Sequence, residues 1–160
     1  MNRDQKQCGC NSNSNSNSNS NSIKNLNINI KWQRLVAKGE TCPRCESTEQ
    51  ELSKAINKLQ QALSPLEIKV TLEKEEINIS EFKQDPLQSN RILINDQPIE
   101  NLLKGKVGQS PCCEVCGPSD CRTMEVDGQI YETIPSELII QAGLVAANQL
   151  LSAKRTDSCC

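Results

Sequence analysis

The sequence predicts an α/β fold: a βαβ unit, then antiparallel strands, with a cysteine-rich loop among them and a C-terminal helix. Apolar and polar residues alternate over residues 28–32 and again over 68–72, which is typical of strands. Between these runs, apolar residues from 52 to 63 recur at helical spacing, and Pro65 marks the end of the helix. A strand, a helix and a strand joined by short loops predict a right-handed parallel unit.

The start of this helix has two candidate positions. Thr48 and Glu51 fit a capping box, which would start the helix at Thr48 and leave Cys42 and Cys45 on a loop. That loop would suit a zinc knuckle. If the first turn begins near Pro43 instead, Cys42 is the exposed thiol and Cys45 lies on the sheltered, inward face of the helix.

Short elements separated by turns follow the βαβ unit. Residues 80–84 fit one helical turn, and residues 91–94 fit a short apolar strand. Asn95-Asp96 is a candidate two-residue turn, after which residues 97–100 return antiparallel. Residues 101–104 fit a further helical turn.

A second hairpin and a long helix complete the predicted fold. Asp127-Gly128 is a strong turn signal between residues 123–126 and 129–134, which read as strands. Pro135-Ser136 opens the last helix, whose apolar residues fall on one face, and Gly143 permits close packing there.

Composition divides the chain into three parts. Residues 1–22 form a tail with six Asn-Ser repeats, which we expect to be disordered because it has nothing apolar to bury. Residues 23–152 form the folded domain, and residues 153–160 form a flexible tail. The first ten residues lack the apolar segment of a signal peptide, and Leu138–Leu151 is too short and too polar to span a bilayer, so we expect no membrane association.

Composition also restricts the chemistry to cysteine. The 160-residue chain has ten cysteines, no histidine and a formal net charge of −2. The lack of histidine excludes mixed Cys/His zinc sites and histidine bases. The charge and the scarcity of aromatic residues argue against nucleic-acid binding. We expect a cytoplasmic protein, whose reduced cysteines favour redox chemistry or metal binding over a disulfide scaffold.

Cys42-x-x-Cys45 lies where the first strand delivers the chain to a helix start. Unpaired backbone N–H groups and the helix dipole stabilise a thiolate there, and Arg44 and Lys38 add positive charge. A reactive Cys42 would attack a disulfide, and Cys45 would resolve the mixed disulfide. Half of a structural zinc site is an equally good interpretation of this pair.

Four further cysteines lie close together in a loop that contains glycine and proline: Cys112, Cys113, Cys116 and Cys121. Cys42-x2-Cys45 and Cys113-x2-Cys116 together have the ligand spacing of a four-thiolate site. If the third strand turns back immediately, the chain returns to the end that holds Cys42 and the loop is within reach; we favour this arrangement. If that strand pairs with residues 123–126 instead, the loop is a self-contained four-cysteine knuckle at the opposite end.

Ligation by thiolates alone selects soft ions: zinc, cuprous copper, iron–sulfur clusters and metalloids such as arsenite. Adjacent cysteines, as at Cys112-Cys113, are awkward ligands for one tetrahedral zinc but suit trigonal arsenite or linear mercury. The terminal cysteines repeat such pairs and suggest capture and hand-over of a thiophilic ligand; that they have no role is the alternative. They are Cys8, Cys10, Cys159 and Cys160.

Five stretches carry a family resemblance: Lys31–Leu35, Thr41–Cys45, Ser89–Asn95, Gly108–Cys113 and Ile134–Ile140. On these stretches, residues 28–151 resemble a prokaryotic domain-of-unknown-function family with a thioredoxin-like fold, within the thioredoxin and glutaredoxin superfamily. The resemblance implies a thioredoxin-like fold and no particular activity.

One position departs from the superfamily pattern. The superfamily usually has a cis-proline just before its third strand, facing the Cys-x-x-Cys, and Asn90 stands there in this sequence. In relatives that proline blocks metal capture by the thiols. Its loss implies that metal or cluster binding at Cys42 and Cys45 is easier than in a disulfide exchanger.

Two functions from different classes follow from the sequence. The first is a cytoplasmic thioredoxin-like thiol protein that exchanges disulfides or handles thiophilic metals or metalloids, with a thiol reductant or a protein disulfide as its partner. The second is a non-enzymatic protein that holds zinc or an iron–sulfur cluster. The candidate metal ligands are Cys42, Cys45, Cys112, Cys113, Cys116 and Cys121.

Overall fold

Two β-sheets and four α-helices form the part of the chain that this computed structural model describes, residues 26–157. The first sheet has the strand order β2-β1-β3-β4 and the second has the order β5-β6-β7. The strands are β1 (Leu26–Leu35), β2 (Ile68–Ile77), β3 (Arg91–Ile94), β4 (Gln97–Pro98), β5 (Lys106–Ser110), β6 (Cys121–Val126) and β7 (Gln129–Tyr131). The helices are α1 (Pro43–Leu63), α2 (Ile79–Gln84), α3 (Ile99–Leu103) and α4 (Ser136–Asp157).

The predicted parallel βαβ unit is confirmed. β1 pairs with β2 in parallel along its whole length, from Leu26 opposite Ile68 to Leu35 opposite Ile77, and α1 connects the two strands. On its other side β1 pairs antiparallel with β3. Trp32 therefore lies on an interior strand, where its side chain is fully buried. The α/β fold class predicted from the sequence is correct.

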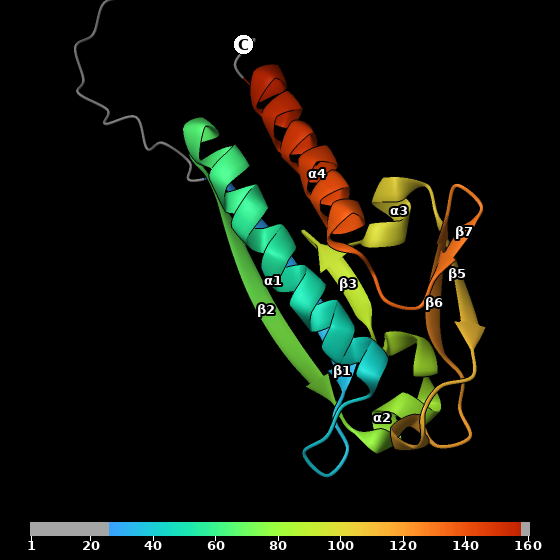
Figure 1. Ribbon diagram of the computed structural model, residues 1–160. Coiled ribbons are helices and arrows are strands. Elements are labelled where there is room, and N and C mark those ends of the chain that lie inside the picture. Colours follow the sequence, from blue (N-terminus) through green and yellow to red (C-terminus); the bar gives the residue numbers. More distant parts are fainter. Residues whose placement is uncertain (1–25, 158–160) are drawn as a thin grey trace, which may run out of the picture.

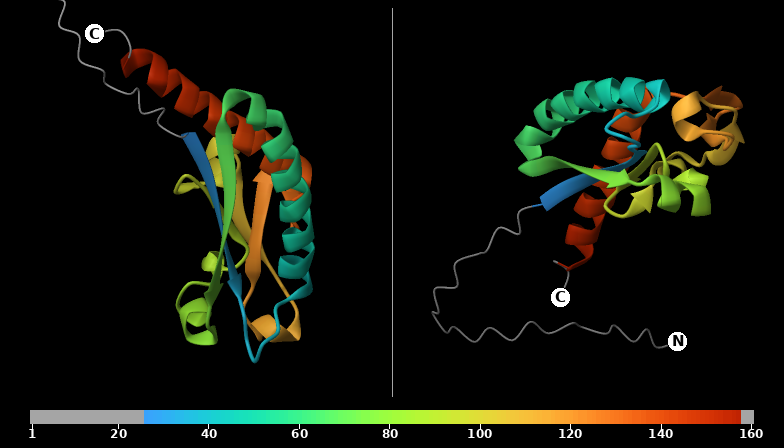
Figure 2. Two further views of the ribbon diagram at one scale, coloured as in Figure 1. Left: turned by 90° about the vertical axis from the view of Figure 1, so that its left-hand side faces the viewer. Right: turned by 90° about the horizontal axis from the view of Figure 1, so that it is seen from below.

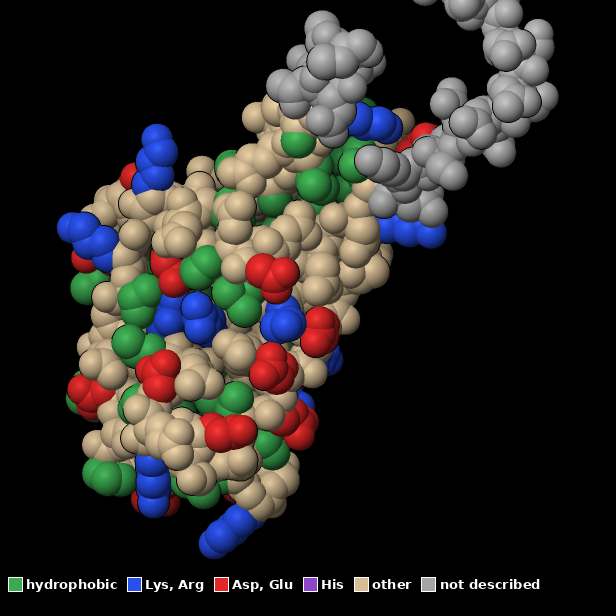
Figure 3. All heavy atoms as spheres, turned by 180° about the vertical axis from the view of Figure 1, so that it is seen from behind, with side chains coloured by type: hydrophobic (Ala, Val, Ile, Leu, Met, Phe, Trp, Pro, Cys, Tyr) green, Lys and Arg blue, Asp and Glu red, His purple; other side chains and the backbone are tan. Residues whose placement is uncertain are grey.

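α1 and α4 cover one face of the first sheet (Figure 1). On β1, alternate residues face these helices, among them Ile28 and Ile30, which are fully buried. Gly143 of α4 allows the two helices to approach closely, since a methyl group there would lie 2.6 Å from the Leu59 Cδ1 atom of α1. Seen from behind, the molecule carries intermingled positive and negative side chains rather than a patch of one sign (Figure 3).

The predicted capping box is wrong. α1 begins at Pro43, so Thr48 and Glu51 lie inside the helix. Their side chains instead serve the start of α4: the Ile134 N–H donates to Thr48 Oγ1 over 3.3 Å, and the Ser136 N–H donates to Glu51 Oε2 over 2.9 Å. The N-terminus of α4 is thus capped by side chains distant in sequence, which also ties it to α1.

The later elements agree with the sequence prediction in part. The hairpin at Asn95-Asp96 forms, and both residues have the positive φ values that a tight hairpin turn requires (49° and 63°). β6 and β7 form the second hairpin, although β7 ends at Tyr131 rather than 134. β5, which pairs with β6, was not predicted. α4 continues to Asp157, so the described part of the predicted tail 153–160 is helical.

The two ends of the molecule differ in what they carry. The start of β1 and the C-terminal ends of α1 and α4 lie at one end, while α2, the turn after β1 and the loop between β5 and β6 lie at the other (Figure 1). Both views of Figure 2 place that loop next to the N-terminal end of α1. The predictions for residues 1–22 and for the four terminal cysteines fall outside the described residues. Within residues 26–157, no helix has the length and apolar character needed to cross a membrane.

Candidate metal centre

A tight turn carries the chain from β1 to the start of α1. Ala37 and Glu40 exchange backbone hydrogen bonds of 2.9 and 3.0 Å around Lys38 and Gly39, whose φ values of 54° and 82° are left-handed. Next, the Thr41 hydroxyl donates to the Leu35 carbonyl over 2.8 Å, which holds the chain against the end of β1. This path makes Cys42 the N-cap residue of α1, with the proline that favours a first helical turn directly behind it.

Both cysteines of the Cys-x-x-Cys motif are buried. Cys45 is fully buried, as its inward register predicted. The expectation that Cys42 is the exposed thiol is wrong, because its residue exposure is 1%. The helix does begin at Pro43, but the loop between β5 and β6 covers Cys42, and the sequence of the motif alone contains no information about that cover.

The loop brings three more sulfurs to Cys42. Cys112 and Cys113 precede a short 3₁₀ turn, Glu114–Cys116, which ends at Gly117 with a φ of 63°. Four Sγ atoms then lie within 4.8 Å of one another. They belong to Cys42, Cys112, Cys113 and Cys116.

This grouping differs from the pairing predicted from ligand spacing. The immediate hairpin after β3 does bring the loop to the end that holds Cys42, as in the arrangement favoured from the sequence. The fourth sulfur of the group, however, belongs to Cys112 rather than to Cys45. Spacing within each motif could not distinguish these two, because the choice depends on how the loop meets the helix.

Cys45 and Cys121 lie directly beside the four-sulfur group. Cys121 opens β6, and its thiol donates to Cys116 Sγ over 3.0 Å. Cys45 Sγ lies 3.6 Å from the Ser89 hydroxyl, and its thiol interacts electrostatically with that of Cys42. All six described cysteines are free thiols. Every cysteine that the sequence suggested as a ligand in the folded domain therefore lies at one end of the molecule.

Arg44, between the two motif cysteines, holds the loop onto the helix. Its guanidinium donates to Ser110 Oγ over 2.9 Å, to the Pro111 carbonyl over 2.6 Å and to Glu132 Oε1 over 2.7 Å. Ser110 Oγ in turn donates to Glu132 Oε1 over 3.0 Å. From the sequence we expected Arg44 to act as a nearby positive charge. In the structure its charge is paired with Glu132, and its contacts fix the residues just before Cys112.

Ser89 and Asn90 lie directly before β3, near the start of α1 and the end of β1. The Ser89 hydroxyl accepts a hydrogen bond from the Leu35 N–H over 3.2 Å and lies beside Cys45. Asn90 has a φ of 59°, a left-handed conformation that proline, with its φ fixed near −65°, is unable to adopt. Its side chain accepts from Trp32 Nε1 and donates to the Glu132 carbonyl, both over 3.2 Å. The backbone at Asn90 therefore excludes a proline at this position, where the superfamily that the sequence resembles usually has one.

The thiols around Cys42 favour a thiolate at this position. The neighbouring Cys121 and Cys45 thiols stabilise its anionic sulfur and lower the pKa of Cys42 far below the usual thiol range. The same interactions, followed by burial, raise the pKa values of Cys45 and Cys121. Burial is the main reason that the pKa values of Cys112 and Cys116 are raised. One anionic sulfur is thus surrounded by neutral thiols, and a metal that binds them all displaces their protons.

A groove of about 680 Å³ adjoins the cluster at Cys116. It runs between the turn after β1, α2 and the 3₁₀ turn of the loop, and Val36, Lys38, Lys83 and Val115 are among its lining residues. Cys116 is among the residues that line the groove, although only 2% of its surface is exposed.

The fold and the cluster define an α/β protein with a cysteine-only group that can hold a metal ion. Residues 28–143 match the family described as Domain of unknown function (DUF2703), and the chain belongs to this family. An uncharacterized protein of Archaeoglobus fulgidus is 46% identical over 110 residues, which cover 69% of this chain and 80% of that protein. No solved structure matches the chain.

Proposed function

We propose that the protein binds a thiophilic metal or metalloid ion through Cys42, Cys112, Cys113 and Cys116, and that its role is to hold or transfer such an ion. The observation that carries the proposal is the set of four Sγ atoms within 4.8 Å of one another. Thiolates select zinc, cuprous copper, iron–sulfur clusters and metalloids, because all of these are soft acceptors. A reducing compartment such as the cytoplasm would keep the thiols available for them.

Adjacent cysteines were expected to be awkward ligands for one tetrahedral zinc, but the dimensions of the cluster, which includes both Cys112 and Cys113, suit a tetrahedral ion. With zinc–sulfur bonds of about 2.3 Å, the sulfurs of a tetrahedral site lie about 3.8 Å apart. The four sulfurs of the cluster need only small side-chain rotations to reach that spacing. Arg44 supports the arrangement from outside, because its hydrogen bonds to Ser110 and Pro111 hold the chain in place directly before Cys112.

We infer that the fold is thioredoxin-like. The inference is supported by the order β2-β1-β3-β4, with β1 and β2 parallel and β3 antiparallel, and by a Cys-x-x-Cys at the start of α1. Thiol–disulfide exchange by Cys42 and Cys45 is accordingly the second candidate function. The position of both thiols at the start of α1, where they interact with each other, favours it, since a resolving thiol then lies beside the nucleophile. The 1% exposure of Cys42 opposes it, because a protein disulfide partner must reach that sulfur.

Metal content separates the two functions. The full-length protein is purified anaerobically under reducing conditions, and bound zinc, copper, iron and arsenic are counted per chain by elemental and native mass spectrometry. We expect one ion or cluster per chain, and we expect Cys113→Ala to lose it. A matched variant with serine at Cys8, Cys10, Cys159 and Cys160 should retain it.

The opposite outcome is equally clear. If no ion is retained, if added zinc fails to bind, and if a Cys42–Cys45 disulfide forms that a thioredoxin-type reductant opens, the metal-binding proposal is overturned in favour of exchange.

A further inference from the structure

Two thiols of the cluster are left over when one four-coordinate ion is bound. Cys45 and Cys121 are 0% and 3% exposed, respectively, and neither belongs to the four-sulfur group. Buried cysteines often act simply as small apolar residues. These two, however, lie beside the group: Cys121 Sγ lies 3.0 Å from Cys116 Sγ, and Cys45 lies in the first turn of α1, where its thiol interacts with that of Cys42.

Cys116 has sulfur neighbours both inside and outside the four-sulfur group. Its Sγ atom lies within 4.8 Å of those of Cys42, Cys112 and Cys113, and 3.0 Å from that of Cys121. Cys121 is buried and adds a fifth sulfur to the four of the group. A thiolate that has further thiols beside it in this way is placed to bridge two neighbouring ions.

The donor atoms indicate which ions would use such bridges. In the described part of the chain, the group that can hold a metal contains cysteine only. Zinc is satisfied by four terminal ligands and needs no bridging. Cuprous copper is softer and is stable with two or three thiolates, so six thiols can hold several cuprous ions when sulfurs are shared.

We propose that the six thiols form one thiolate-bridged cluster that binds more than one cuprous ion, with Cys121 and Cys45 supplying donors beyond the four that would hold a single zinc. The proposal rests on the proposed function and deepens it by naming the preferred ion and its number. Each neutral thiol releases one proton on binding, the Cys42 thiolate releases none, and copper remains in the cuprous state throughout.

The test counts cuprous ions against zinc ions in one protein. The full-length chain carries serine at Cys8, Cys10, Cys159 and Cys160, so that only the six clustered thiols are counted. Cuprous ion is added anaerobically in competition with a chromophoric cuprous chelator, zinc is added in parallel, and native mass spectrometry reads the number bound. We expect one zinc ion and at least two cuprous ions. Cys121→Ala and Cys45→Ala should each lower the cuprous count and leave the zinc count at one.

Three results would be informative in different ways. A single cuprous ion in the parent protein, or a cuprous count that neither alanine variant lowers, overturns the cluster proposal while the proposed function stands. Failure to retain either ion overturns both. Circular dichroism verifies folding; if Cys121→Ala unfolds, Cys121→Ser, which keeps the size and lacks the soft donor, is measured instead, and it should lower the cuprous count in the same way.

Discussion

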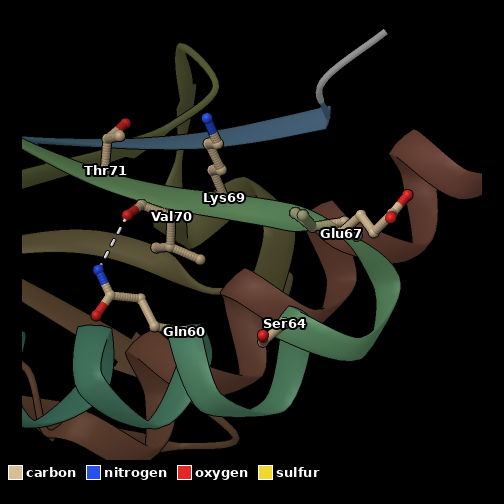
Figure 4. Close-up of a pocket in the computed structure, with 7 residues that line it drawn as sticks. Gln60, Ser64, Glu67, Lys69, Val70 and Thr71 are labelled. Atoms are coloured by element: carbon tan, nitrogen blue, oxygen red, sulfur yellow. Dashed lines mark hydrogen bonds between the residues drawn. The ribbon is translucent and has the colours of Figure 1, made fainter. Parts of the chain in front are cut away.

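The two ends of α1 show what distinguishes a site from a hollow surface. At the C-terminal end a groove of about 490 Å³ lies between α1 and β2, lined by Gln60, Ser64, Glu67, Lys69 and Thr71 among others (Figure 4). These polar side chains are exposed and do not converge; Figure 4 marks a hydrogen bond of 3.2 Å from Gln60 Nε2 to the backbone carbonyl of Val70. At the N-terminal end six thiols meet, and most of them are buried.

Convergence of buried donors, rather than the volume of a groove, therefore marks the candidate site. The C-terminal groove has a structural explanation, because β2 is an edge strand and Gln60 satisfies one of its unpaired carbonyls. The N-terminal cluster has no such explanation, since free thiols contribute little as hydrogen-bonding groups and six of them together exceed what packing requires.

Substitution of Arg44 should have the largest effect and is the strongest test of this difference between the two ends of α1. We expect Arg44→Gln to weaken zinc binding about 10- to 100-fold, the usual cost of losing a residue that orients metal ligands. Binding is measured by competition with a chromophoric chelator, and the absorption of the cobalt-substituted protein reports whether four thiolates still coordinate. Arg44→Lys should recover only part of the loss, because an ammonium lacks the planar fork that reaches three acceptors.

Gln60→Ala, at the other end of α1, is the matched control for Arg44. It should leave zinc affinity and the cobalt spectrum unchanged. Equal effects of the two substitutions on zinc affinity would show that the hydrogen bonds of Arg44 do not orient the metal ligands.

At Gly143 we expect the opposite pattern, a loss of stability without a change in metal binding. Gly143→Ala should lower the free energy of unfolding by about 1–3 kcal/mol, because the added methyl group overlaps the fully buried Leu59 side chain. Urea denaturation measures this, and the zinc stoichiometry should not change. In a Leu59→Ala background the same substitution should cost less, since the clash is removed and alanine favours a helix by about 1 kcal/mol over glycine. An unchanged cost in that background would contradict the packing argument.

The smallest effect is expected at Glu51, midway between the two regions. Lys54 and, after it, the Ser136 N–H lower the pKa of Glu51 to about 2. Because the folded-state pKa lies below the unfolded value of about 4.3, the carboxylate's contribution is complete above that value and is lost as pH falls toward 2. Glu51→Gln should thus cost about 1 kcal/mol or less at pH 7, the scale of a helix cap.

Urea denaturation of the reduced apo protein at several pH values tests the Glu51 prediction. The stability difference between the parent and Glu51→Gln should shrink between about pH 5 and pH 2. A difference that stays constant over this range would show that Glu51 does not cap α4 as a carboxylate.

The sequence was most informative where structure depends on local pattern. The alternation over residues 28–32 and 68–72 predicted the two parallel strands, and the helical spacing before Leu52 predicted that Cys45 faces inward. β5 was missed because its residues, Lys106–Ser110, are polar and mostly exposed, so they show no apolar alternation.

Long-range contacts account for the remaining differences. Thr48 and Glu51 have the local pattern of a capping box, but the N–H groups they accept from belong to the start of α4. Cys42 is buried by a loop that lies about seventy residues further along the sequence. The choice of Cys112 over Cys45 as fourth sulfur depends on the same loop, which Arg44 positions.

The hydrogen bonds of Trp32 give the protein a built-in optical reporter. This residue is the chain's one tryptophan, and its indole is fully buried and bonded to Asn90. Asn90 in turn bonds to Glu132, which pairs with Arg44 at the edge of the cluster. When tryptophan is excited selectively, the emission therefore comes from one indole, which a chain of hydrogen bonds and an ion pair connects to the edge of the candidate metal centre. If an ion binds as proposed, that emission would follow its loading and release in real time, without a dye or an engineered label.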